Sequence, residues 1–205
     1  MDFIADLHTH SPYSRATSPE GTLQGLASWA RVKGIHVVAT GDFTHPGWFK
    51  NLRENLEPAE PGLFRLKDEG TIASPLPGVA SSRALVRFLL SAEISSIYKR
   101  DGSVRKVHNL LYLPDFASAE RIAATLAGIG NIESDGRPIL GLDSRDLLDI
   151  LLTKAPEGFL VPAHIWTPWF SLSGPGPVLT PSRHASATSR PRFLLWRRVF
   201  PPIRK

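Results

Sequence analysis

The sequence predicts an α/β fold with a mostly parallel sheet or barrel, and three observations lead to this prediction. Short apolar segments alternate with helix-like segments that begin near Ser or Asp and end near Gly or Pro. The chain has 205 residues, 42% of them hydrophobic, which is enough for one domain with a core. It contains no cysteine, so neither disulfides nor thiolate metal sites can contribute.

The expected elements follow one another along most of the chain. Strands are expected where short runs of β-branched and large apolar residues occur, over 3–10, 35–42, 86–95, 104–113 and 158–166. Helices are expected between them, over 18–34, 118–130 and 143–156. The segment 57–82 is rich in Pro and Gly and is expected to be a surface loop.

The positive charge of the chain is unevenly distributed. The net charge is +5, but seven of the 24 basic residues and none of the 19 acidic residues follow Leu172. Residues 1–172 therefore hold 17 basic and 19 acidic residues, a net charge of −2. The overall basicity is consequently weak evidence for nucleic-acid binding.

Several classes of protein are not expected from this sequence. No stretch approaches eighteen apolar residues, so we expect no membrane span. The N-terminus begins with an acid and lacks the charge pattern of a secretory signal, so we expect a soluble, cytoplasmic protein. The chain has no Gly-Lys pair, and therefore no phosphate loop for a nucleoside triphosphate.

Histidine and acidic residues are placed where a metal site would form. His8 and His10 lie two apart on an expected strand, so their side chains share a face. Such a pair can hold one metal ion or can be two ordinary hydrogen-bonded residues at a strand end. The other expected strands carry further candidates at or near their C-terminal ends: Asp42, His45, Glu93, His108 and His164. Active sites of parallel α/β folds form at these ends.

The residue types point to metal-assisted hydrolysis. Imidazole and oxygen ligands without thiolate suit Zn²⁺, Mn²⁺ or Fe²⁺, and Glu93 could bridge two ions. Two or more ions suit phosphoester hydrolysis, because one lowers the pKa of a bound water and the others neutralise the phosphate and the leaving oxygen. The pattern therefore predicts a multinuclear metallohydrolase. His36, at a strand start, is expected to be structural.

The motifs also carry a family resemblance. The strings "DLHTHSPYS", "TGDFTHP", "SAEIS", "RKVHN" and "PAH" resemble, in chain order, the metal motifs of the PHP (polymerase and histidinol phosphatase) superfamily. Longer strings such as "GNIESDGRPILGLDSRDLL" are similar to the PHP domain of the endonuclease Q family, over nearly all of residues 1–172. The resemblance implies a distorted (β/α)7 barrel with a trinuclear metal site. We expect two or three divalent ions, zinc first, with manganese or iron as alternatives. It also implies a DNA substrate, nicked on the 5′ side of deaminated bases or at abasic sites.

Individual residues carry the resemblance to different degrees. The implied metal ligands are His8, His10, Asp42, Glu93, His108 and His164. We expect Asp42, Glu93 and His164 to act in catalysis as well. His45 is a further candidate ligand, although Phe43 and Thr44 separate it from Asp42, whereas many superfamily members have the histidine next to the aspartate. The last superfamily motif, an Asp-x-His near the end of the barrel, has no counterpart here.

Contacts with DNA are expected at the mouth of the site. The candidates are Tyr13, Arg15, Arg105, Lys106, Trp166 and Trp169. Each has an ordinary alternative: Arg15 could be a solvated loop charge, and the tryptophans could pack against the barrel rim. Arg137 could be a phosphate contact or a structural ion-pair partner.

The segment 173–205 is rich in Pro, Ser and Arg and has no acidic residue. It could be a basic arm or a linker, but back-translation one base out of phase recovers strings similar to the endonuclease Q family at this point. We therefore expect a partial PHP domain over 1–172, incomplete at its C-terminal end, and an out-of-frame, disordered tail over 173–205. Such a fragment is expected to be poorly stable and inactive. Two other functions stay open: a phosphatase of small phosphate monoesters, and a non-catalytic PHP-like binding module.

Overall fold

The computed structural model describes residues 2–78, 85–100 and 102–171, and the tail expected over 173–205 lies outside them. Within these ranges the chain forms a mixed α/β structure with one eight-stranded sheet. The strands are β1 (Ala5–Asp6), β2 (Val37–Ala39), β3 (Leu56–Pro58), β4 (Phe64–Leu66), β5 (Arg87–Arg100), β6 (Ser103–Leu113), β7 (Ile139–Leu140) and β8 (Phe159–Pro162). The helices are α1 (Leu23–Lys33), α2 (Pro46–Asn55), α3 (Phe116–Ala127) and α4 (Ser144–Lys154), with a short 3₁₀ helix, η1 (Glu69–Thr71).

Each expected strand and helix contains or overlaps an element of the same type, and the loop expected over 57–82 needs correction. That segment holds most of β3, all of β4 and η1. Helix α2 has no counterpart among the expected elements, and it begins at a Pro-Gly pair, which is more typical of turns. Pro46 instead occupies the first position of the helix, where its missing N–H would have no partner in any case.

The sheet is mixed rather than mostly parallel, which corrects the sequence-based expectation. Pairs β1–β2, β2–β5 and β5–β7 are parallel, whereas β3–β4, β4–β5, β5–β6 and β6–β8 are antiparallel. The reason lies between β5 and β6, where Arg100 pairs with Ser103 and only an Asp-Gly pair connects the strands. Gly102 there has φ 73°. A two-residue loop of this kind makes a hairpin, because a parallel strand needs a much longer crossover.

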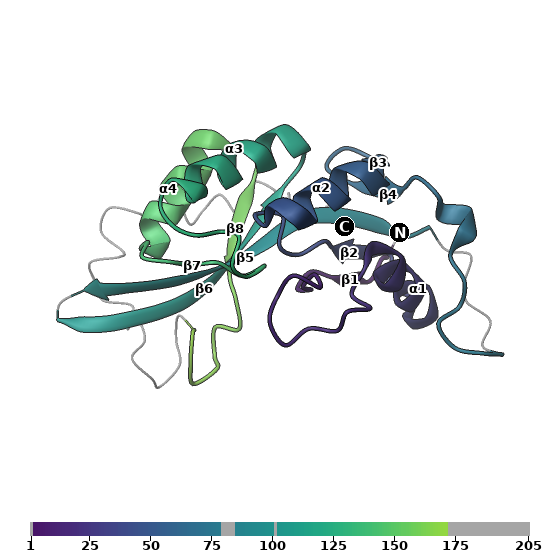
Figure 1. Cartoon of the computed structure of the whole chain (residues 1–205), viewed down its shortest axis with the longest axis horizontal. Helices are drawn as coiled ribbons and strands as arrows, with labels where there is room; N and C mark the ends of the chain where they lie inside the picture. The colour runs from purple at the N-terminus through teal and green to yellow at the C-terminus, as the bar shows by residue number, and fades with distance from the viewer. Residues whose placement is uncertain (1, 79–84, 101, 172–205) are drawn as a thin grey trace, which may run out of the picture.

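Strand β5 organises the molecule. Its first residues pair with β2 and β4, and the rest of its length pairs with β6 and β7. In the view of Figure 1, α3 and α4 lie next to each other above the β5–β6 hairpin, while α1 lies beside β1 and β2. Residues from all four α-helices contribute to one apolar core with alternate residues of β5.

The alternation along β5 separates this core from a polar face. Phe88, Leu90, Ala92 and Ile94 are fully buried in the apolar core. The residues that alternate with them along the strand belong to the opposite face, because successive side chains of a strand point in opposite directions. Those residues include the buried polar side chains Ser91, Glu93 and Ser95. A second, smaller apolar cluster contains Ala39, Leu110, Tyr112 and Ala163.

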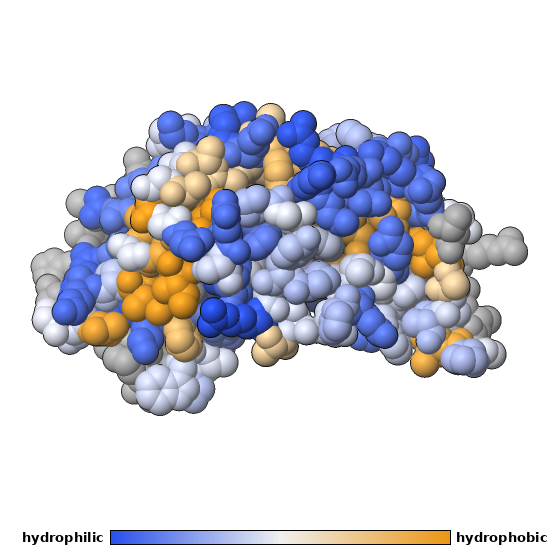
Figure 2. All heavy atoms as spheres, viewed as in Figure 1, coloured by the Kyte–Doolittle hydropathy of each residue, from blue (hydrophilic) through white to orange (hydrophobic). Residues whose placement is uncertain are grey.

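The described part of the sheet is open. Strand β1 pairs only with β2, and β8 pairs only with β6, so closure into a barrel stays a prediction. Figure 2 shows a largely hydrophilic surface on one face, with a hydrophobic area over β7. Ile139 of β7 is 64% exposed. Among the described helices, none combines the length and apolar character required to cross a bilayer.

Candidate metal centre

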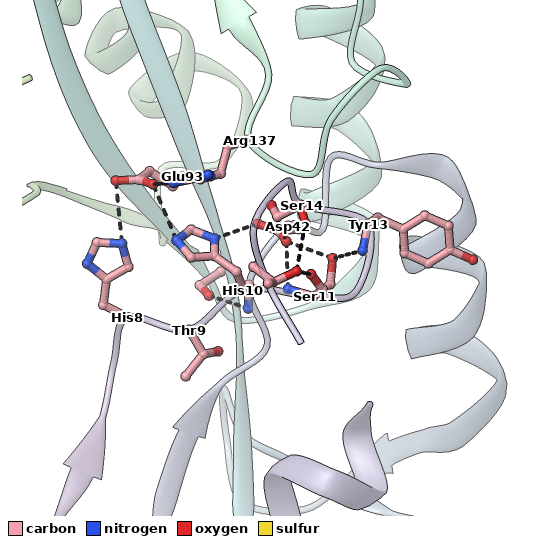
Figure 3. A network of polar contacts seen from close by, with 12 residues as sticks. His8, Thr9, His10, Ser11, Tyr13, Ser14, Asp42, Glu93 and Arg137 are labelled. Atoms are coloured by element: carbon pink, nitrogen blue, oxygen red, sulfur yellow. Dashed lines mark hydrogen bonds and ion pairs between the residues drawn. The ribbon is translucent and has the colours of Figure 1, made fainter. Parts of the chain in front are cut away.

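His8 and His10 follow strand β1 rather than lying on it. The strand ends at Asp6, and the two histidines occupy the loop that leads away from it. Both side chains nevertheless point toward Glu93 (Figure 3). The Nε2 atom of His8 lies 3.4 Å from Oε1 of Glu93, and Nε2 of His10 lies 3.4 Å from Oε2. The Tyr112 hydroxyl donates to the carbonyl oxygen of Leu7 at 2.7 Å, which holds this loop against β6.

The antiparallel strands bring the other two histidines to the same carboxylate. His108 lies on β6 opposite Ser95 of β5, and its Nδ1 is 3.0 Å from Oε1 of Glu93. His164 follows β8, where the N–H of Ala163 donates to the carbonyl oxygen of His108 at 2.9 Å. Its Nε2 is 3.5 Å from the same Oε1. The hairpin and the third strand beside it therefore assemble this half of the site.

Two groups of potential metal ligands share Glu93. One consists of His8, His10 and Glu93, and the other of Glu93, His108 and His164. Within each group the ligand atoms lie within 4.8 Å of one another. Oε1 of Glu93 is buried and accepts no hydrogen bond, although three imidazole nitrogens lie within 3.5 Å of it. Nitrogen and oxygen lone pairs that converge in this way fit divalent cations such as Zn²⁺, Mn²⁺ or Fe²⁺.

The middle of this site carries the negative charge of Glu93. Burial alone would raise the pKa of Glu93, but contacts with His108 and His8 outweigh burial and hold the pKa well below its usual range. The contact with Glu93 raises the pKa of His8 above its ordinary value. Burial, assisted by the charge of His108, lowers the pKa of His164. Glu93 is therefore an ionised carboxylate surrounded by imidazoles, which favours a cation between them.

Asp42 lies beside this centre and is fully buried. Its Oδ1 is 3.1 Å from Nδ1 of His10 (Figure 3). Its Oδ2 accepts hydrogen bonds from the backbone and hydroxyl of Ser11, each at 2.7 Å, and from the Ser14 hydroxyl at 2.9 Å. Asp42 is not part of either ligand group formed by the described residues. Its direct role as a ligand or catalytic group stays a prediction.

His45 also lies outside both ligand groups of the described chain. It stands at the N-cap position of α2, and its Nε2 is 3.0 Å from the carbonyl oxygen of Glu133. Its ring packs against Tyr13 in a tilted arrangement, with centroids 4.3 Å apart. Its expected role as a ligand therefore stays a prediction. His36 has a structural contact, since its Nδ1 accepts a hydrogen bond from the N–H of Ile4 at 3.1 Å.

The aromatic candidates for DNA contact are exposed. Trp166 is 78% exposed and Trp169 is 63% exposed, and they lie two and five residues after His164 in the chain. Neither ring is buried in the described core, and both the DNA-contact role and the alternative of packing against the barrel rim stay predictions. Tyr13 is 45% exposed and points away from Glu93 in Figure 3.

The basic candidates have different environments. Arg15 is largely exposed, and its Nε is 3.5 Å from Oδ2 of Asp135. The ammonium of Lys106 lies over the Phe170 ring, 5.6 Å from the centroid. Arg105 lies opposite Tyr98 in the β5–β6 register. None of these contacts tests the DNA-binding role.

The structure adds residues that the sequence did not single out. Ser11 and Ser14 hold Asp42, and their only signal was their place within the "HTHSPYS" string. Gly136 approaches so closely that a Cβ there would lie 2.5 Å from both Oδ2 of Asp42 and Oγ of Ser14. Arg137, for which sequence left two roles open, places Nη1 3.9 Å from Oε2 of Glu93.

Comparison with known proteins gives an independent view. No protein-family model matches the chain. The chain is 24% identical over 164 residues to an uncharacterised protein of Methanocaldococcus jannaschii, which covers 80% of this chain and 16% of that protein. It is 31% identical to the crystal structure of the lesion-specific endonuclease PfuEndoQ from Pyrococcus furiosus, with a TM-score of 0.64. A structure of endonuclease Q with a 27-mer duplex substrate, with an abasic lesion at the active site, gives the same identity and TM-score.

Both structural matches are partial on the side of the known protein. They cover 82% of this chain but 36% of the solved chains, so this chain spans about a third of their length. The expected resemblance to endonuclease Q is confirmed as a similarity in sequence and structure. The chain is thus similar to part of a lesion-specific DNA endonuclease.

Proposed function

We propose that this domain is a divalent-metal-dependent phosphodiesterase that acts on DNA, in the manner of a lesion-specific repair endonuclease. The observation that carries the proposal is Glu93, a buried carboxylate shared by two groups of imidazole ligands. The similarity to endonuclease Q supports DNA, rather than a small phosphate ester, as the substrate.

The ligands have a clear division of work in this proposal. His8, His10, His108 and His164 would hold divalent ions around Glu93, two or three of them in the complete enzyme. Bound ions would supply a water of lowered pKa and positive charge for the phosphate oxygens. The donors are imidazole and carboxylate without thiolate, which suits zinc, manganese or iron, and zinc is the ion we expect first.

Other residues would bind the DNA around this centre. Arg137 brings a guanidinium within 3.9 Å of Glu93, where it can pair with a phosphate. Trp166 and Trp169, two and five residues after His164, offer exposed rings on which a displaced base can stack. As the specific substrate, we propose DNA with a deaminated base or an abasic site, cut on the 5′ side of the base or at the abasic site.

We also propose that the chain as written is an incomplete and inactive form of this enzyme. Asp149 is the last aspartate in the sequence. The given sequence therefore has no Asp-x-His motif after His164. The described strands β1 and β8 have unpaired edges, at which a barrel would be closed. Sequencing the encoding DNA across codons 172 and 173 tests whether a frameshift there placed residues 173–205 out of the original reading frame. An intact frame in independent reads contradicts it.

One experiment separates the functional readings. Metal content is measured on the purified chain, and nicking is measured with a frame-restored protein on DNA that carries uracil, hypoxanthine, an abasic site or no lesion. We expect bound metal and lesion-dependent nicking that a chelator abolishes. Hydrolysis of p-nitrophenyl phosphate without DNA nicking would indicate a phosphatase. Absence of bound metal in both proteins would indicate a binding module and refute the proposal.

A further inference from the structure

We propose that Asp42 is a positioning residue: it fixes the tautomer of His10, so that His10 offers Nε2 to the ion shared with Glu93. This inference rests on the proposed function, because it assumes that the His8–His10–Glu93 group binds a metal. It differs from the ligand role that the family resemblance implies for Asp42.

The His10 ring lies between two carboxylates. Its Nδ1 is 3.1 Å from Oδ1 of Asp42, and its Nε2 is 3.4 Å from Oε2 of Glu93 (Figure 3). A neutral imidazole has one N–H and one lone pair, and the hydrogen bond of one nitrogen decides the role of the other. If Nδ1–H donates to Asp42, the lone pair of Nε2 faces the ligand group. A carboxylate behind a ligating histidine is a recurrent arrangement in metal sites.

The surroundings of Asp42 hold it in this role. Three donors from Ser11 and Ser14 already occupy Oδ2, so the carboxylate can turn toward the ligand group only by losing them. The side chain is fully buried, and unpaired donors left behind would each cost about 1–3 kcal/mol. The backbone of Gly136 packs closely against the same oxygen, since a Cβ at this position would lie 2.5 Å from Oδ2.

The backbone conformation at Gly41 and Asp42 also fixes the direction of the Asp42 side chain. Gly41 and Asp42 both have positive φ, 64° and 51°, and a non-glycine residue in that region is costly unless its surroundings require it. The N–H of Phe43 donates to the carbonyl oxygen of Ser91 on β5 at 3.1 Å, which fixes the turn against the strand that carries Glu93. The turn therefore places the Asp42 carboxylate on the Nδ1 side of the His10 ring, away from the Nε2 side that faces Glu93.

The first test reads the tautomer directly. In metal-free wild-type protein, ¹⁵N–¹H long-range NMR of the neutral His10 ring should show the proton on Nδ1. A proton on Nε2 overturns the inference without any variant. The variant Asp42→Asn keeps the shape, but its amide must direct an NH₂ group either at the donors of Ser11 and Ser14 or at His10. We expect it to lose the preference for Nδ1–H.

The second test reads metal affinity in the same proteins by calorimetric titration with zinc. We expect Asp42→Asn to weaken binding about ten- to hundredfold, the usual cost of removing a partner behind a ligating histidine. The matched control is Asp6→Asn, which removes a nearby carboxylate that accepts the N–H of His8 but does not contact His10. This control should leave the His10 tautomer unchanged.

The outcomes separate this inference from the proposed function. If wild-type protein binds no zinc although His10 carries its proton on Nδ1, the proposed function fails and the tautomer assignment stands. If Asp42→Asn loses one zinc ion while the tautomer is unchanged, Asp42 is a ligand and the inference fails. If both tautomer and affinity are unchanged, the inference also fails. Should Asp42→Asn not fold, the wild-type tautomer and Ser14→Ala, which leaves the carboxylate in place, decide the matter.

Discussion

At the scale of single residues, Glu93 carries more of the site than any other described side chain, because both ligand groups contain it. Replacing Glu93 with Gln keeps its size but removes its charge. We expect the bound metal of both groups to fall together, which elemental analysis of the purified variant measures. Glu54→Gln is the control, since Glu54 pairs with Lys50 on an exposed helix surface. Retention of half the metal in Glu93→Gln would mean that the two groups do not share this ligand.

A second residue-scale prediction concerns Gly136. A methyl group there would overlap Oδ2 of Asp42 and Oγ of Ser14, so Gly136→Ala must displace the loop or the carboxylate. We expect a loss of about 1–3 kcal/mol in the free energy of unfolding, as for other overpacked sites, together with weaker zinc binding. Gly141→Ala is the matched control, because a Cβ there meets nothing within 4 Å. Equal denaturation midpoints for the two variants would contradict the close approach at Gly136.

The positions of the ligands could be predicted from sequence better than their partners. His8, Glu93, His108 and His164 stand at or near apolar runs, and the chemistry of their side chains made a shared site a natural expectation. The role of Asp42 could not be predicted in the same way. It depends on a positive-φ turn and on two serine hydroxyls, and nothing in the spacing of the sequence reports the direction of a side chain at such a turn.

At the scale of elements, the β5–β6 hairpin decides the geometry of the site. Antiparallel pairing places His108 beside Glu93 and brings β8, and with it His164, against β6. The alternation of strands and helices predicted parallel neighbouring strands. The direction of β6 relative to β5 instead follows from the short connection between them. The Asp-Gly pair at 101–102 was the local signal for a hairpin. Helix α2 was missed for a similar reason, since a proline can either end or begin a helix.

The segment after β8 offers a prediction about DNA. The double variant Trp166→Ala, Trp169→Ala should weaken binding of single-stranded DNA containing an abasic site, because base–aromatic stacking contributes about 1–3 kcal/mol per base. Fluorescence anisotropy of labelled DNA measures the change. Trp29→Ala on α1 is the control, as that ring is 38% exposed and pairs with Lys33. An equal loss in the control variant would show that the rings near His164 have no special part in binding.

At the scale of the whole molecule, the ligand groups join segments that are distant in the sequence. The loop after β1, strand β5, strand β6 and the segment after β8 each contribute at least one ligand. Sequence analysis predicted the α/β class correctly, and similarity to PfuEndoQ agrees with it. Strands β1 and β8 are edges within the described residues, so closure into a barrel stays a prediction.

This arrangement predicts that metal stabilises the fold. Zinc or manganese that binds only the folded chain should raise its thermal midpoint, with a gain of about 2.7 kcal/mol when free metal exceeds its dissociation constant a hundredfold. Scanning calorimetry measures the shift, and a chelator should reverse it. Glu93→Gln should show little of this gain. A midpoint that ignores metal in the wild-type protein, or that rises equally in Glu93→Gln, would count against ligation by these residues.

The single carboxylate shared by the two groups has one more consequence, which concerns the order in which ions are loaded. Glu93 supplies one buried negative charge, whereas two divalent cations bring four positive charges to the partly exposed imidazoles around it. The two charges of the first cation would exceed the one charge of Glu93, so the second cation would enter against repulsion. A phosphate anion would relieve that repulsion, and thermodynamic reciprocity requires that the second cation strengthen phosphate binding by the same factor. If the proposed function holds, the second cation would then bind tightly only when a phosphate-containing substrate is present.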